Sequence, residues 1–189
     1  MTESERSDGP ERGEKPGKTR TQWHPLFVRM LTHALSNAFT VVDEVQVGKM
    51  PLQVDILLIR RESGQLSEIG RRELAALVPL LNRFTLIEFK GPTDSLERGD
   101  FAHLVGCAFL WVGQQTDAID HDEISLVVLA PTINGPFRDE LRQFGYEASE
   151  IGPGIFRVAG LPFAIWFVET DVMANQDEPI LSLVSRILI

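Results

Sequence analysis

A chain of 189 residues, 43% of them hydrophobic, is long enough to form one domain with a substantial core. Its 27 acidic side chains outnumber the 18 lysines and arginines and give a net charge of -9, which argues against a protein that holds nucleic acid through a broad basic surface. The single cysteine, Cys107, excludes an internal disulfide and a multi-cysteine zinc site.

The sequence favours a cytoplasmic protein. Its first residues are polar and lack the apolar segment of a signal peptide, and no apolar run is long enough to span a bilayer. Cys107 lies among apolar neighbours, which predicts a buried, unreactive thiol. A chain without disulfides also suits a reducing compartment.

Residues 1–20 are predicted to be a disordered tail, because after Met1 they contain no large apolar side chain. Their charges balance, so the whole net charge belongs to the single domain predicted for residues 21–189. Within that domain we distinguish a core, about residues 23–130, from an α/β extension, residues 131–189.

Hydrophobic periodicity predicts an α/β fold, a mixed sheet of about five strands with helices on both faces. In the core the predicted order is helix, strand, strand, helix, strand, helix, strand, at residues 23–39, 39–47, 52–60, 69–81, 83–91, 94–114 and 124–130. A turn at residues 48–51 joins the first two strands as a hairpin. The last helix of the core is expected to start with Asp94 or Ser95 as its N-cap.

The extension is predicted to add a helix, a hairpin, a strand and a closing helix, at residues 136–144, 146–158, 162–170 and 178–189. The chain ends in Ile187, Leu188 and Ile189, which is unusually apolar for a free end. The closing helix could dock in the core, form a homodimer, or mark a truncated chain.

Three charged side chains interrupt the apolar strands of the core. Glu88 and Lys90 lie two residues apart near the end of one strand, and Asp55 is the only acidic residue of another. Because alternate strand residues point to the same face, Glu88 and Lys90 share a face. Charges inside apolar strands are costly unless they are paired or bind a ligand, so we expect the three to meet at one end of the sheet.

The charges of this trio indicate a divalent cation. Two carboxylates at close range repel each other unless a cation or a shared proton neutralises them. Oxygen ligands suit Mg²⁺ or Mn²⁺ rather than zinc. Such an ion would activate water and stabilise a pentavalent phosphorus centre, while Lys90 would position the nucleophile or offset developing charge.

Asp55, followed at a distance by Glu88, Phe89 and Lys90 and then by a helix, resembles the PD-(D/E)XK nuclease superfamily. The sequence from residue 87 to residue 96 is similar to bacterial families related to the recombination-promoting and transposase-associated nucleases. The resemblance covers about residues 23–130. It implies a restriction-endonuclease-like fold, DNA as substrate, and Mg²⁺ or Mn²⁺ held by Asp55, Glu88 and the backbone carbonyl of Phe89, with Lys90 as a catalytic residue.

The resemblance also directs attention to neighbouring polar residues. Many superfamily members carry an acidic residue on the first helix, but here that helix has none, and its His24 and His33 are expected at the surface or as caps. Asp43 or Glu44 could be an auxiliary ligand, although an exposed polar face explains both. On the helix after the motif, where relatives often place a Gln or Tyr, His103 is the best-placed polar candidate.

Two other interpretations stay open. A degenerate domain that keeps the fold and acts as a binding or interaction module is favoured by the acidic surface, the missing first-helix carboxylate and the separation of Pro51 from Asp55, which are adjacent in the strict motif. Alternatively, Asp55, Glu88 and Lys90 form a salt-bridge network without a ligand. The intact trio favours the nuclease, because a purely structural role does not require three charges at the end of a sheet.

Overall fold

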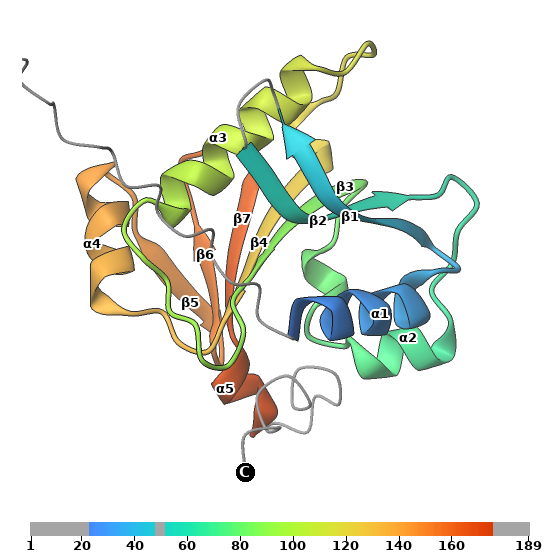
Figure 1. Ribbon diagram of the computed structural model, residues 1–189, viewed down its shortest axis with the longest axis horizontal. Coiled ribbons are helices and arrows are strands. Elements are labelled where there is room, and N and C mark those ends of the chain that lie inside the picture. The colour runs from blue at the N-terminus through green and yellow to red at the C-terminus, as the bar shows by residue number, and fades with distance from the viewer. Residues whose placement is uncertain (1–22, 48–51, 176–189) are drawn as a thin grey trace, which may run out of the picture.

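The computed structural model describes residues 23–47 and 52–175 (Figure 1). The predicted tail, the turn at residues 48–51 and the closing helix at residues 178–189, with the homodimer that it suggested, lie outside the described residues. Among the helices that are described, none is both long enough and apolar enough to cross a membrane.

Seven strands and five α-helices make up this part of the chain. The strands are β1 (Phe39–Val47), β2 (Leu52–Arg60), β3 (Phe84–Phe89), β4 (Ile124–Ala130), β5 (Ala148–Gly152), β6 (Ile155–Val158) and β7 (Ala164–Glu169). The α-helices are α1 (Trp23–Leu35), α2 (Glu68–Glu73), α3 (Asp100–Gly113), α4 (Gly135–Gln143) and α5 (Thr170–Ala174), with short 3-10 helices at Val78–Leu80 and His121–Glu123.

All seven strands form one mixed sheet in the order β1-β2-β3-β4-β7-β6-β5. The central strands β3, β4 and β7 are parallel, and antiparallel pairs extend the sheet on both sides. Parallel neighbours need a crossover connection, which α3 supplies between β3 and β4. The predicted α/β fold is confirmed, but with seven strands rather than about five, because the strands of the extension join the core sheet where β7 pairs with β4.

Two apolar clusters cover the two faces of the sheet, as predicted. One contains Leu104 of α3 and Phe137 of α4, and the other contains Phe27 of α1 and Met173 of α5. Figure 1 shows α3 and α4 on one side of the sheet and α1 and α2 on the other. β4 is buried along its whole length because both of its faces are covered, which explains its continuous apolar sequence.

The helix after the motif strand begins later than predicted. Asp94 does not cap it, because its Oδ2 accepts a hydrogen bond from the Gly91 N–H (3.2 Å) and closes a turn after β3. α3 begins at Asp100, preceded by Gly99, whose φ of 104° is readily adopted only by a residue without a Cβ. The N-cap predicted at Asp94 or Ser95 is therefore wrong.

The two earlier helices of the core are shorter than predicted. α1 ends at Leu35, although the helical pattern was extended to residue 39. A helix is predicted for residues 69–81, but the observed helix α2 ends at Glu73. Pro79 lies in a separate 3-10 helix. A proline inside an α-helix lacks the N–H that the helix needs and clashes with the preceding turn, so a continuous α-helix through Pro79 is disfavoured.

A buried carboxylate of the extension holds the start of α3. Glu140 on α4 is 4% exposed, and its two oxygens accept hydrogen bonds from the backbone N–H groups of Gly99 (2.8 Å) and Ala102 (3.2 Å). The first N–H groups of a helix have no partner within the helix, and a negative charge near them is also favoured by the helix dipole. Glu140 thus fixes the helix that follows the motif strand.

Glu140→Ala should lower the free energy of unfolding by about 2–4 kcal/mol, because two N–H groups lose a buried, charged acceptor. Urea denaturation at constant pH measures the change. Glu147→Ala is the matched control, since Glu147 is exposed, and it should change the free energy by less than about 0.5 kcal/mol. Equal losses in the two variants would contradict the role given to Glu140.

Candidate functional site

The pairing of β2 with β3 ends just before the charged residues. The last ladder pair is Ile56 with Ile87. In that register the next residues, Asp55 and Glu88, would face each other, but instead Oδ2 of Asp55 accepts a hydrogen bond from the backbone N–H of Phe89 at 2.9 Å. A side-chain oxygen therefore replaces the missing strand partner and brings Asp55 to the motif strand.

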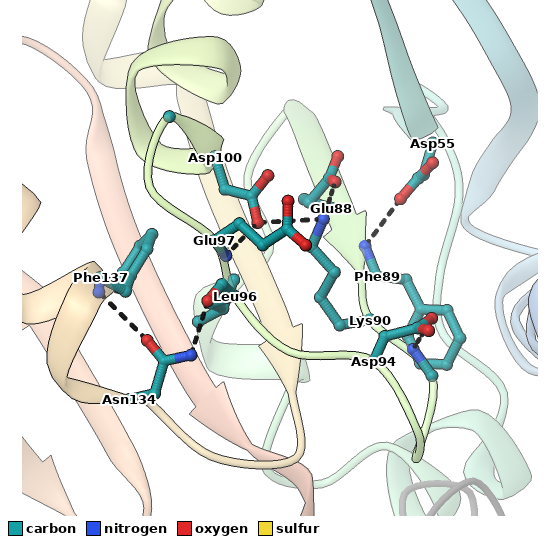
Figure 2. Close-up of polar contacts among 12 residues, drawn as sticks. Asp55, Glu88, Phe89, Lys90, Asp94, Leu96, Glu97, Asp100, Asn134 and Phe137 are labelled. Carbon is teal, nitrogen blue, oxygen red and sulfur yellow. Dashed lines mark hydrogen bonds and ion pairs between the residues drawn. The ribbon is translucent and has the colours of Figure 1, made fainter. Parts of the chain in front are cut away.

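Lys90 lies between two carboxylates (Figure 2). Its Nζ is 3.0 Å from Oε1 of Glu88 and 3.1 Å from Oδ2 of Asp100, and none of the three side chains is more than 15% exposed. Glu88 and Lys90 share a face of β3, as the alternation predicts. Phe89 points to the opposite face, where its ring stacks on that of Phe27 with 4.4 Å between centroids.

Burial and neighbouring charges shift the protonation of this cluster. The pKa of Glu88 is raised from 4.5 to about 7, first by burial and then by the charge of Asp55, against the lowering effect of Lys90. Burial lowers the pKa of Lys90, but the ion pairs with Glu88 and Asp100 outweigh it and raise that pKa above its ordinary value. At neutral pH Lys90 is therefore an ammonium, and Asp55 lies close enough to Glu88 for their charges to interact.

His24 is buried, not at the surface or in a cap as the sequence predicts. It is 5% exposed in the first turn of α1, and its Nε2 is buried without a hydrogen-bond partner. That nitrogen lies 3.6 Å from Oδ1 of Asp43 and 4.0 Å from Oδ1 of Asp55. The expectation is therefore wrong for His24, because the residue lies on the apolar stripe of α1; His33, on the other face, is exposed.

The auxiliary candidates Glu44 and His103 lie on β1 and on α3. Glu44 is exposed and has a φ of 54°, at the point where the β1–β2 ladder skips the position opposite Asp55. His103 is half-buried on α3, with its Nε2 3.5 Å from the Sγ of Cys107. The thiol is buried as predicted, and burial followed by the charge of Glu88 raises the pKa of Cys107 to about 11.

The backbone carbonyl predicted as a ligand is directed to the same edge as Asp55. The N–H of Phe89 points to Asp55, while the N–H of Lys90 points across to β4, where it donates to the carbonyl of Leu129 at 2.8 Å. The N–H and C=O of one strand residue point to the same edge. The carbonyl of Phe89 therefore also faces the β2 side.

The His24 nitrogen lies at two distances that match the spacing of ligands bound to one divalent ion. Two ligands that are each about 2.1 Å from one Mg²⁺ lie roughly 3.0–4.2 Å apart, and both contacts of the His24 nitrogen fall within that span. That nitrogen is a buried polar atom that lacks a partner, which ordinarily requires an explanation. In residues 23–47 and 52–175 no group of three or more His, Cys, Asp or Glu side chains is arranged to hold a metal ion.

Sequence reasoning missed His24 and Asp100. The burial of His24 could have been predicted, because the residue shares the helical spacing of Phe27 and Leu31 and so lies on the buried face of α1. For Asp100 there was no local signal. A helix starting at residue 94 or 95 would have placed it in the second turn, and the true start depends on the distant Glu140.

The raised pKa of Glu88 predicts a pH dependence of stability. Between about pH 4.5 and pH 7 the folded protein keeps the Glu88 proton that the unfolded chain has released. The folded state then binds more protons, so the free energy of unfolding falls as pH rises, by at most roughly 1.4 kcal/mol per pH unit from this group. Urea denaturation across this window should show a steeper fall for the wild type than for Glu88→Gln, and parallel profiles would contradict the shift.

Comparisons with protein-family models, with curated proteins and with solved structures give no match. The resemblance to PD-(D/E)XK nucleases therefore depends on Asp55, Glu88 and Lys90 and on the order of the elements that carry them.

Proposed function

We propose that this protein is a metal-dependent nuclease that hydrolyses DNA phosphodiester bonds, similar to PD-(D/E)XK proteins. The observation that carries this proposal is the meeting of Asp55 with the Glu88–Lys90 pair where β2 and β3 separate. Buried ion pairs contribute little to stability, whereas shifted protonation in a cluster of charges is typical of functional sites. A cluster of this kind in an apolar sheet therefore favours chemistry over a purely structural role.

The order of elements supports the resemblance. From α1 to β4 the chain forms a helix, three antiparallel strands, a helix and a strand parallel to β3, with α2 inserted before β3. This is the order predicted together with the motif. Because one fold can serve many functions, the order supports the family resemblance but does not by itself support hydrolysis.

Asp55, Glu88 and the carbonyl of Phe89 would hold Mg²⁺ or Mn²⁺, and Nε2 of His24 would join them. When bound, the ion supplies positive charge and a water of lowered pKa. A nitrogen ligand favours Mn²⁺ over Mg²⁺, which prefers oxygen. Oδ2 of Asp55 is already used by the Phe89 N–H, so Oδ1, the oxygen nearest His24, is the one left for the ion.

Lys90 acts as a hydrogen-bond donor rather than as a base. Its two carboxylate partners keep it protonated. An ammonium can orient the attacking water or stabilise the negative charge that develops on the phosphate oxygens, and such preorganised charge is often the largest contribution to catalysis.

DNA as substrate follows from the resemblance, and the net charge of -9 disfavours strong binding of DNA in the absence of the cation. The cytoplasmic location stays a prediction.

A second function, a non-catalytic binding module with this fold, is favoured by the surroundings of Lys90. Its side chain is only 9% exposed and already contacts two carboxylates. A module of this kind would stay folded and keep its partner after substitution of Asp55 or Lys90. It would not require a cation.

Calorimetry and a plasmid-nicking assay with Mn²⁺ separate the two functions. Asp55→Ala and Glu88→Ala should abolish Mn²⁺ binding and cleavage. Lys90→Ala should keep most of the binding but lower cleavage by at least about 100-fold, the loss expected for one transition-state donor. Asp139→Ala, in an exposed ion pair with Arg142, is the control and should match the wild type. A wild type that neither binds Mn²⁺ nor nicks plasmid would reject the nuclease and leave the module.

His24→Ala should weaken Mn²⁺ binding by at least about tenfold, because the ion loses a nitrogen ligand. His33→Ala is the matched control on the same helix, since His33 is exposed. Titration calorimetry of both variants measures the difference. Equal affinities would show that the buried imidazole takes no part in binding the ion.

A further inference from the structure

Asp100 contacts Lys90 from outside the motif. It is the first residue of α3, and its Oδ2 accepts a hydrogen bond from the Glu97 N–H (2.8 Å) while lying 3.1 Å from Nζ of Lys90. In the view of Figure 2, Asp100 and Asp55 lie on opposite sides of the Glu88–Lys90 pair. Asp100 is thus a second counter-charge for the lysine, on the side of the pair away from Asp55.

The backbone on both sides of Asp100 is fixed. Gly99 and Ala102 donate to the buried carboxylate of Glu140, and the buried ring of Phe101 packs edge-on against that of Phe137 in α4. The side chain is further restrained by the Glu97 N–H. The carboxylate of Asp100 is therefore held in place by its surroundings. Glu88, in contrast, is also a ligand of the ion in the proposed function.

The proposed ion would compete with Lys90 for Glu88. If Glu88 bound the ion, one of its oxygens would turn away from Lys90, and the ammonium would be repelled by the positive charge beside it. Among the residues that the structure describes, the carboxylates within 4.0 Å of Nζ of Lys90 are those of Glu88 and Asp100. With Glu88 engaged in this way, Asp100 would be the one of these two carboxylates that still holds the lysine.

We propose that Asp100 is a positioning residue for Lys90, keeping the ammonium in the site when Glu88 turns to the divalent ion. The role given to the ion rests on the proposed function, whereas the contact between Asp100 and Lys90 does not. Asp100 touches neither substrate nor ion. It acts through the lysine, by preventing the ammonium from leaving as the ion arrives.

Acylation of lysines followed by mass spectrometry tests the contact without any cleavage. Lys90 is protected as long as its amine stays between its partners, so Asp100→Asn should raise its labelling roughly tenfold, the change expected for losing one hydrogen bond between charged groups. With Ca²⁺ added as a non-catalytic ion, Lys90 should stay protected in the wild type and become still more reactive in Asp100→Asn.

Asp94→Asn is the matched control. It makes the same chemical change in the loop that leads to α3, where Asp94 accepts a hydrogen bond from the Gly91 N–H rather than from a lysine, and it should label like the wild type. Should Asp100→Asn fail to fold, Asp100→Ser takes its place, because a serine oxygen can still accept from the Glu97 N–H but cannot reach Lys90. Labelling of Lys90 equal to that of the Asp94→Asn control, or loss of protection in the wild type with Ca²⁺, overturns the proposal.

Kinetics distinguish positioning from a structural role. In Mn²⁺-supported cleavage Asp100→Asn should lower kcat by about 10–100-fold, the effect of a misplaced catalytic group, with KM and Mn²⁺ affinity unchanged and with partial recovery in Asp100→Glu. A structural role would instead weaken Mn²⁺ binding and thermal stability together. If the wild type binds no ion and cleaves nothing, the nuclease fails, and the ion-free labelling still decides whether Asp100 anchors Lys90.

Discussion

The hydrogen bond from the Phe89 N–H to the Asp55 carboxylate is the contact on which the site depends. Two strands that stop pairing leave backbone groups without partners, and a buried N–H without an acceptor is costly. Asp55 supplies that acceptor through Oδ2 and keeps Oδ1 toward His24. One carboxylate thus completes the end of the ladder and leaves one oxygen for a ligand, which explains why an acidic residue is tolerated in this apolar strand.

The extension shares one sheet with the core, and its hydrogen bonds hold the segment that leads from the motif strand to α3. Asn134 donates to the carbonyl of Leu96, and Glu140 accepts from the first turn of α3, so the segment between the motif and α3 is held by α4. The start of α4 is in turn tied to the sheet, because Glu169 of β7 accepts from the Ile133 N–H at 2.8 Å. The lysine of the motif therefore depends on contacts that lie well beyond the residues that resemble a nuclease.

Local patterns in the sequence were sufficient to locate the strands, because alternation and apolar runs are properties of neighbouring residues. The buried run of β4 and the shared face of Glu88 and Lys90 are examples. The start of α3 could not be found in this way, since it is set by Glu140, which lies 41 residues from Gly99 in the chain. Helical spacing predicts that His24 is buried with Phe27 and Leu31. The general preference of histidine for partly exposed positions predicts the opposite. Likewise, the joining of the extension to the core sheet depends on the pairing of β4 with β7, which no local pattern encodes.

The stack of Phe27 on Phe89 has a consequence for the dynamics of the first helix. α1 carries His24 one turn before Phe27, so detachment of this helix would withdraw the imidazole and uncover the ring of Phe89 in one opening event. Segments at the margin of a domain open with less free energy than central strands do. An ion shared by α1 and the sheet would add its binding free energy to that opening. Amide hydrogen exchange along α1 would then slow on addition of the ion, and this helix would report ion binding without any cleavage assay.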